Sequence, residues 1–424
     1  MTTRQDALAL DARDPLAALR AQFSLPEDVI YLDGNSLGVL PTATPARVAA
    51  AVQDEWGSGL IRSWNSAGWV DLPQRVGDKI GRLIGAGPGQ TLAADSTSVN
   101  LFKVLSAAIA IVKAGGDTQR RVIVSERSNF PTDLYIAESL ARQHGFTLQL
   151  VEPDEIAAQF DSSLAVLMLT HVNYRTGRMH DMAALTRAAH ACGALALWDL
   201  AHSAGAVPVD LLGADADFAV GCGYKYLNGG PGAPGFLWVN PRQLERMERD
   251  GLWQPLAGWF GHAAPFEFSP HYRPAAGIVR FSCGTPPVLG LTALEVGVDT
   301  LLAAESLGGM AALRRKSLAL TCHFITLVEK HCAGHGLSVI TPRTEGERGS
   351  QVNLARADGA YAIVQALIAR GVIGDFRAPD NLRFGFTPLY TRFVDVWDAV
   401  EHLRQVLDTG EWKEARFHQK AAVT

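Results

Sequence analysis

Cysteine, excess positive charge and long apolar runs are all scarce in this 424-residue sequence. Its five cysteines include no CxxC pair and no Cys/His cluster with zinc spacing, so we expect neither a disulfide scaffold nor a metal site. The formal net charge of −5 does not provide the basic face that nucleic acid requires. Apolar runs such as 164–169 are too short for a membrane span, and the acid-containing segment 1–14 has no signal-peptide core. These absences favour a reduced, cytoplasmic protein that acts on small molecules.

Short apolar runs alternate with helical patterns between about residues 90 and 240. We expect strands at 121–125, 147–151, 164–170, 194–199, 218–221 and 235–239, with helices at about 100–113, 132–144 and 181–192. Continuous apolar strands separated by helices are typical of a mainly parallel sheet that is covered on both faces. The fold class predicted for this region is therefore α/β.

The pattern changes after Pro286 and Pro287. Residues 290–332 predict a long helix broken near Gly308 and Gly309. Strands at 351–355 and 381–386 then alternate with helices at about 359–370 and 393–408. We therefore predict three parts: an N-terminal arm (1–50), a large domain (51–290) and a smaller α+β C-terminal domain (291–424). No internal repeat or low-complexity linker interrupts them.

Lys225 is the strongest candidate for a chemical role. It lies in the segment Gly-Cys-Gly-Tyr-Lys-Tyr-Leu-Asn-Gly-Gly, 221–230, after a short apolar run. Burial there would favour the neutral amine that Schiff-base chemistry needs, although a lysine reaching solvent from a loop is the alternative. Asp199 and His202 follow the preceding apolar strand. An aspartate there is either a helix cap or the anion that keeps the pyridine nitrogen of pyridoxal phosphate (PLP) protonated.

Hydroxyl-bearing residues supply a candidate phosphate site. Thr97 and Ser98 precede an apolar helix that has no acid near its start, and helix N-termini attract anions. Plain N-capping explains the same residues equally well. Thr285 adds a hydroxyl beside a glycine turn, and Tyr224 could reach the phosphate through its phenol.

These pieces, in this order, resemble fold-type-I PLP enzymes of the class V aminotransferase-like branch. Within that branch the chain is similar to the kynureninase family along most of its length. The motifs that carry the resemblance are YLDGNSLG (31–38), FPTD (130–133), WDLAHSAG (198–205), GYKYLN (223–228), GWFGH (258–262) and LRFGFTPLY (382–390).

The resemblance implies a large domain with a mainly parallel seven-stranded sheet and a smaller C-terminal domain. It implies PLP-dependent hydrolysis of L-kynurenine to anthranilate and L-alanine in tryptophan catabolism, in a homodimer with shared active sites. Cleavage of 3-hydroxykynurenine is a second expected reaction. Thr285 follows the bacterial pattern rather than the eukaryotic Asn-Pro-Pro, which favours kynurenine.

Residue roles carry over from the family pattern. Lys225 would form the Schiff base and move the Cα proton, Asp199 would pair with the pyridine nitrogen, and Tyr224 or Lys225 would be the final acid. Phe130 would stack on the ring, with His202 and Asp133 at its hydroxyl side and Thr97, Ser98 and Tyr224 on the phosphate. The implied cofactor-binding residues are Thr97, Ser98, Phe130, Asp133, Thr170, Asp199, His202, Tyr224, Lys225, Trp259 and Thr285, with Trp259 and Thr285 coming from the partner subunit. The implied substrate-binding residues are Asn35, Ser36, Trp64 and Arg383, with Arg383 on the α-carboxylate.

Several of these residues have simpler interpretations. Phe130 could be ordinary core beside a helix-starting proline, Arg383 could face solvent, and Trp64 and Trp259 could be packing residues. A cysteine desulfurase or aminotransferase of the same branch is the alternative function. A desulfurase needs a cysteine with a lowered pKa on a mobile loop, and none of the five cysteines has that setting.

Overall fold

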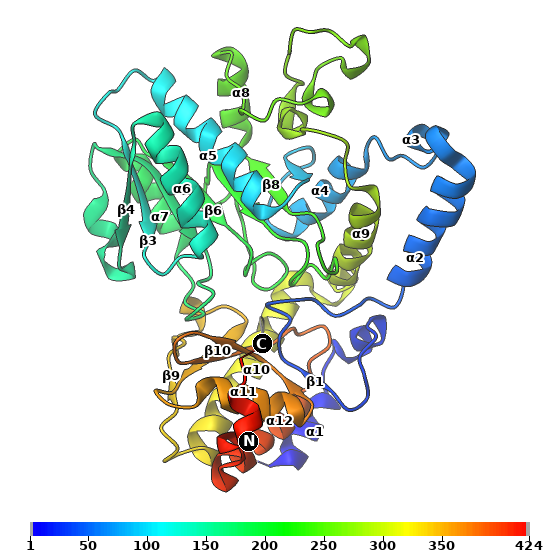
Figure 1. Cartoon of the computed structure of the whole chain (residues 1–424), viewed down its shortest axis with the longest axis vertical. Coiled ribbons are helices and arrows are strands. Elements are labelled where there is room, and N and C mark those ends of the chain that lie inside the picture. The colour runs from blue at the N-terminus through cyan, green and yellow to red at the C-terminus, as the bar shows by residue number, and fades with distance from the viewer. Residues whose placement is uncertain (1–2, 421–424) are drawn as a thin grey trace.

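The computed structural model describes residues 3–420 and has two main parts (Figure 1). A large twisted sheet with its helices fills the upper part of the view, and the C-terminal segments lie below it together with the N-terminal helix α1 (Arg4–Asp11). The long helices α9 (Val288–Leu302) and α10 (Gly309–His331) follow the large sheet in the chain and lead into the lower part.

The large sheet has seven strands in the order β2-β8-β7-β6-β5-β3-β4, as the family resemblance predicted. Strands β4, β3, β5, β6 and β7 are mutually parallel, whereas β8 runs antiparallel to both of its neighbours. The strands are β2 (Thr91–Ala93), β3 (Val122–Glu126), β4 (Thr147–Val151), β5 (Leu164–Thr170), β6 (Leu195–Asp199), β7 (Phe218–Gly221) and β8 (Phe236–Val239). The mainly parallel α/β architecture is therefore confirmed.

Helices cover both faces of this sheet because its strands are apolar on both sides. In β5, Val166 and Met168 join one buried cluster while Leu167 and Leu169 join another. Helices α5 (Thr97–Ala114) and α6 (Pro131–His144) supply apolar side chains to the first cluster; α4 (Leu72–Leu83), α7 (Met182–Ala191) and α9 supply the second. Helix α5 is the one described helix long and apolar enough to span a membrane, and more than half of it is buried here.

The C-terminal part has its own core. A four-stranded antiparallel sheet in the order β12-β13-β10-β9 packs with helices α10, α11 and α12. Its elements are β9 (Ser338–Val339), β10 (Gln351–Ala355), α11 (Ala360–Ala369), β12 (Asp375–Arg377), β13 (Asn381–Gly385) and α12 (Phe393–Thr409). Strand β1 (Ile30–Tyr31) pairs in parallel with β11 (Val372–Ile373), and Ala7 and Leu32 are buried in the same core. The described N-terminal segment thus contributes directly to the C-terminal core through residues such as Ala7 and Leu32.

Local signals account for most element boundaries. The predicted helix break is present: α9 ends at Leu302 and α10 begins at Gly309, with φ of 101° at Gly308 and 57° at Gly309. Such positive φ values favour glycine, which has no Cβ to clash with the backbone. The remaining α-helices of the described chain are α2 (Thr44–Ala50), α3 (Ser63–Ser66) and α8 (Pro241–Arg249).

Candidate active site

A cavity of about 130 Å³ lies at the edge of the large sheet where the parallel strands end. Thr170 is the last residue of β5, Asp199 is the last of β6, and Lys225 follows β7 by four residues. Carboxyl ends of parallel strands meet at one edge of a sheet, so these side chains converge. Nine of the predicted cofactor residues line this cavity: Thr97, Ser98, Phe130, Asp133, Thr170, Asp199, His202, Tyr224 and Lys225.

The amine of Lys225 faces a histidine rather than a carboxylate. Its Nζ lies 3.0 Å from Nε2 of His202, and Nδ1 of that ring lies 3.0 Å from Oε1 of Gln351 on β10. Burial, together with the positive charge of Lys225, lowers the pKa of His202 well below its usual range. His202 is therefore neutral at physiological pH and available as a hydrogen-bond partner for the amine.

Two buried carboxyl groups lie side by side beneath this lysine. Oδ1 of Asp199 accepts a 2.7 Å hydrogen bond from the N–H of Ala201, and its side chain is also hydrogen-bonded to Asp133. Burial, then the negative charge of Asp199, raises the pKa of Asp133 well above the usual aspartate range. Ionising two adjacent carboxyl groups costs electrostatic free energy. Asp133 therefore stays protonated and donates a hydrogen bond to Asp199.

The opposite wall of the cavity is the N-terminus of α5. Ser96 caps the helix, its Oγ accepting from the N–H of Val99 at 3.3 Å, so it is Thr97 and Ser98 that begin the helix. The first turn has no acidic residue, and free backbone N–H groups at such a terminus bind anions. A Cβ at Gly235 would lie 2.9 Å from the backbone N of Thr97, so only glycine lets β8 approach the terminus this closely. Ser96 therefore performs the capping, which leaves Thr97 and Ser98 as candidates for anion binding.

Aromatic rings enclose the lysine. The Nζ of Lys225 lies 5.7 Å from the ring centroid of Tyr224 and 6.0 Å from that of Phe130. Phe130 precedes Pro131, the first residue of α6, yet it is 43% exposed and lines the cavity, so it is not a core residue. Its ring makes an edge contact with Tyr174 at 5.4 Å between centroids. Burial raises the pKa of Tyr224 to about 12, which keeps its phenol protonated.

Arg383 is buried in a separate polar cluster beside the cavity, which disagrees with the solvent-facing alternative. Its Nε donates to Oδ1 of Asp375 at 2.7 Å, and its Nη2 donates to Oγ of Ser36 at 2.6 Å and to Oδ2 of Asp375. Its Nη1 donates to the carbonyl of Tyr174 at 3.1 Å. Ser36 and Arg383 are therefore in direct contact. Asn35 is buried nearby against Gly385, with no hydrogen-bond partner for either atom of its side-chain amide.

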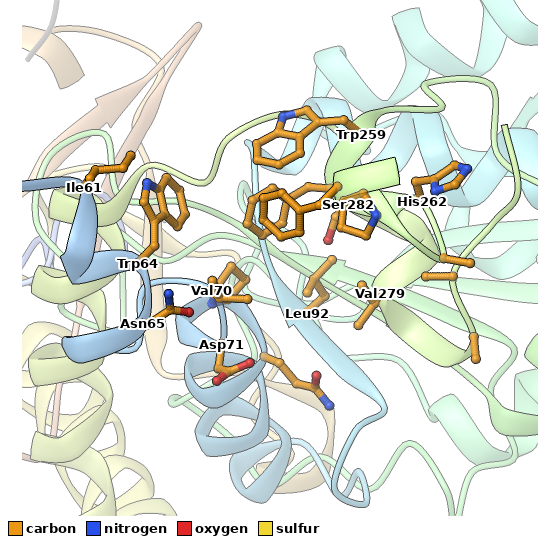
Figure 2. A pocket seen from close by; sticks show the side chains of 18 residues that line it. Ile61, Trp64, Asn65, Val70, Asp71, Leu92, Trp259, His262, Val279 and Ser282 are labelled. Atoms are coloured by element: carbon orange, nitrogen blue, oxygen red, sulfur yellow. The ribbon is translucent and has the colours of Figure 1, made fainter. Parts of the chain in front are cut away.

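Three predicted residues lie away from the Lys225 cavity in this chain. Trp64 and Trp259 line a larger groove of about 780 Å³; Figure 2 shows Ile61 with Trp64 on one wall and Trp259 with His262 across from them. Thr285 lines a small hollow beside Asp95 and Cys283. A single chain therefore brings together the predicted cofactor residues except for Trp259 and Thr285.

Four further residues belong to the site and were not singled out from the sequence, although Thr132 lies within the FPTD motif. Tyr174 lines the cavity from the loop after β5, and Thr132 lies on the first turn of α6. Gln351 and Asp375 reach the site from the C-terminal sheet, as partners of His202 and Arg383. Each is a common polar residue whose role depends on contacts with distant parts of the chain.

Comparison with known proteins gives the family. A family model described as the kynureninase C-terminal domain matches residues 313–403. Kynureninases from Pseudomonas fluorescens and Burkholderia pseudomallei (strain 1106a) are 57% and 56% identical to this chain over 427 aligned residues, covering 100% of both chains in each pair.

Solved structures agree with this fold at lower identity. A cysteine desulfurase from Thermococcus onnurineus has a TM-score of 0.76 at 17% identity, covering 92% of this chain and 98% of that one. A C-DES mutant with glycine covalently linked to its PLP cofactor has a TM-score of 0.74, with the same identity and coverage. Those structures share the fold, and the full-length relatives at 57% and 56% identity carry the assignment: this chain belongs to the kynureninase family.

Proposed function

We propose that this chain is a PLP-dependent hydrolase that cleaves the Cβ–Cγ bond of L-kynurenine with water, giving anthranilate and L-alanine. The observation that carries the proposal is one cavity that combines the Lys225 amine, the buried Asp199 carboxyl and the N-terminus of α5. Full-length relatives at 57% identity that bear the name kynureninase support the substrate.

The residues around the cavity fit PLP in their chemistry. Lys225 would hold the cofactor covalently through its amine, Thr97 and Ser98 would bind the phosphate at the positive end of α5, and Tyr224 adds a phenol donor. Phe130 presents an exposed ring for stacking. When bound, PLP withdraws electrons from the substrate and so weakens the bonds at its Cα and Cβ.

Asp199 and Asp133 would act as one unit on the pyridine nitrogen. The carboxyl of Asp199 would hold a proton on that nitrogen, and the hydrogen bond from protonated Asp133 supports the negative charge of Asp199. The family pattern implied that Asp133 serves the hydroxyl side of the ring. Its contact with Asp199 favours a different role, in which Asp133 stabilises the negative charge of Asp199. His202 and Thr170 would complete the contacts with the ring.

Lys225 and Tyr224 would move the protons of the reaction. The Lys225 amine would take the proton from the substrate Cα. It is the one primary amine among the described residues that line the cavity, and its hydrogen-bond partner is His202 rather than a carboxylate. The Tyr224 phenol, with its pKa of about 12, would serve as the acid that completes alanine.

Arg383 and Ser36 would hold the substrate α-carboxylate. Arg383 is buried, and charged hydrogen bonds at such a site are strong. Asp375 accepts from both Nε and Nη2 of Arg383, and Ser36 also accepts from Nη2. The carboxylate would therefore be bound through the remaining N–H of Nη1, and the Ser36 hydroxyl, which donates to Asp375 in this structure, would turn towards the substrate. The side-chain amide of Asn35, which has no hydrogen-bond partner in this structure, would supply a further hydrogen bond beside this cluster.

The groove that contains Trp64 and Trp259 would receive the aromatic ring of kynurenine once two copies of the chain pair. Ile61 and Phe266, which line this groove, are 77% and 70% exposed, and apolar patches of this kind are typical of protein interfaces. We infer a homodimer in which Trp259 and Thr285 of one copy complete the site of the other. We also infer a cytoplasmic location, and a preference for kynurenine over 3-hydroxykynurenine set near Thr285.

A desulfurase or aminotransferase is not favoured. Among the described residues, no cysteine lines the Lys225 cavity. Burial raises the pKa of Cys222, the cysteine nearest to Lys225 in sequence, which is the opposite of what a nucleophilic thiolate needs.

The test is to purify the protein with PLP, record its visible spectrum and add L-kynurenine while following anthranilate fluorescence. The proposal predicts a bound-cofactor band and stoichiometric anthranilate and alanine. Parallel reactions with pyruvate or 2-oxoglutarate as amino acceptors should give no transamination. A cofactor band with amino transfer and no anthranilate would contradict the hydrolase and favour the aminotransferase.

A further inference from the structure

Gln351 connects the C-terminal sheet to the lysine site, although it touches neither the cavity nor Lys225. It lies at the start of β10 and is fully buried. Its Nε2 donates to the carbonyl of Tyr174 at 2.9 Å and to that of Asn173 at 3.3 Å. Carbonyl oxygens only accept hydrogen bonds, so these two contacts fix which end of the amide is nitrogen. Its Oε1 must therefore face Nδ1 of His202, which lies 3.0 Å away.

This orientation determines which nitrogen of His202 carries the proton. Oε1 of Gln351 can only accept, so Nδ1 of His202 carries the hydrogen. His202 is neutral because it is buried and because the positive charges of Lys225, Arg383 and Arg377 oppose its protonation. In a neutral imidazole the other nitrogen has a free lone pair. Nε2 of His202 is therefore an acceptor, and it lies 3.0 Å from Nζ of Lys225.

We propose that Gln351 is a positioning residue that fixes the tautomer of His202 and so presents a permanent hydrogen-bond acceptor to the Lys225 amine. This inference deepens the proposed function, because an amine that must collect a proton and deliver it needs a fixed orientation. A lysine side chain has several freely rotating bonds, and one acceptor at 3.0 Å limits where its amine points. The chain Gln351–His202–Lys225 thus transmits the position of the C-terminal sheet to the reacting group.

Asn353 provides a matched control on the same strand. Its Nδ2 donates to the carbonyl of Arg175 at 2.5 Å, so it joins the C-terminal sheet to the same loop that Gln351 contacts. Its Oδ1 accepts from Nε2 of Gln351 at 3.3 Å, but it makes no hydrogen bond to His202 in the described structure, and without Asn353 the Gln351 amide keeps its two carbonyl partners. Substituting Asn353 therefore perturbs the docking of the sheet, whereas substituting Gln351 also perturbs the histidine.

The direct test is the protonation state of the His202 ring, observed by NMR on ¹⁵N-histidine-labelled holoenzyme, with His202→Asn for assignment. The proposal predicts hydrogen on Nδ1 in the unmodified protein, in Asn353→Leu and in Gln351→Glu, which keeps an acceptor for Nδ1. In Gln351→Met a substantial share of the ring should carry its hydrogen on Nε2. Hydrogen on Nε2 in the unmodified protein, or the same tautomer in Gln351→Met, would overturn the proposal.

The functional consequence is measured separately from the tautomer. Gln351→Met should lower kcat for kynurenine by roughly 10- to 100-fold with little change in KM, as expected when one group of a proton-transfer pair is misoriented. The pH at which the visible cofactor band changes should also shift, while Asn353→Leu leaves that pH unchanged. Equal losses of kcat in both variants with no spectral shift would reduce Gln351 to a packing role. If kynurenine is not the substrate, the tautomer and the spectral shift still test the inference.

Discussion

Two hollows of this molecule, the Lys225 cavity and the groove of Trp64 and Trp259, differ in size and in the kind of side chain that lines them. The Lys225 cavity is small and is lined mostly by hydroxyl-bearing and titratable residues, several of which contact one another through hydrogen bonds, as in the Asp133–Asp199 pair. The groove of Trp64 and Trp259 is about six times larger by volume, 780 against 130 Å³, and is lined mostly by apolar and aromatic residues. Under the proposed function, one chain organises the proton chemistry, whereas the substrate ring would bind a surface that a second copy completes.

The largest expected effect is the loss of Lys225. Lys225→Ala should lower kcat/KM for kynurenine by at least about 10³-fold, because the general base and the cofactor anchor disappear together. Anthranilate fluorescence measures the rate. Lys79→Ala is the control, since Lys79 pairs with Glu295 and Asp299 away from the cavity and its loss should leave the rate unchanged. Substantial turnover by Lys225→Ala would show that the Lys225 cavity is not the active site.

Arg383→Lys should have the next largest effect. Lysine keeps the charge but cannot reproduce the fork that contacts Asp375 and Ser36, so KM should rise by roughly 10- to 100-fold. Steady-state kinetics separates KM from kcat. Arg377→Lys, at a half-exposed arginine that shares Asp375, should change KM much less. Equal effects of the two substitutions would argue against Arg383 as the carboxylate site.

The groove is tested by Trp64→Ala. Loss of one aromatic contact should raise KM by about 2- to 10-fold and leave kcat within about twofold, because an aromatic pair contributes only ~0.5–1.5 kcal/mol beyond its buried area. Trp253→Ala is the matched control, since Trp253 is 48% exposed and does not line the groove. An unchanged KM in Trp64→Ala would contradict binding of the substrate ring in this groove.

The smallest expected effect is on stability, and it comes from the buried carboxyl group of Asp33. Burial and the negative charge of Asp375 raise the pKa of Asp33 to about 7. The folded protein therefore binds more protons than the unfolded one between about pH 4 and pH 7, and the free energy of unfolding falls as pH rises through that range. The Asn side chain carries no charge at any of these pH values. Asp33→Asn should therefore leave Tm unchanged near pH 4 and raise it by roughly 2 °C above pH 7.

Calorimetry across this pH range measures the difference between Asp33→Asn and the unmodified protein. The measurement at pH 4 is the internal control, because residue 33 is then uncharged in both proteins. A gain in Tm that is equal at pH 4 and pH 8 would contradict the raised pKa as its cause.

Much of the fold could be predicted because its signals are local. The strands at 147–151, 164–170, 218–221 and 351–355 coincide with the structure, since continuous apolar runs mark buried strands. Strand β2 (Thr91–Ala93) was not predicted, because three residues are too few to show a period. The two-residue strands β1 and β11 depend on a pairing between distant segments that no local pattern reveals.

The residues of the candidate site likewise fall into those that a local sequence pattern identifies and those that depend on long-range contacts. Asp199, His202 and Lys225 could be identified because each follows an apolar strand, where side chains project into a crevice. Gln351 and Asp375 could not, because their roles arise only when the C-terminal sheet packs against the large domain. The placement of Trp259 and Thr285 also could not be derived from one chain, since neither lines the Lys225 cavity.

The central claim is that Lys225 is the residue that binds PLP covalently, and one measurement tests it directly. Borohydride reduces a C=N bond between a lysine and the cofactor to a stable amine, and peptide mapping by mass spectrometry then locates the adduct. The account predicts a single pyridoxyl adduct on Lys225, lost in Lys225→Ala. An adduct on another lysine, such as Lys103, or no adduct in protein that releases anthranilate from kynurenine, would contradict it.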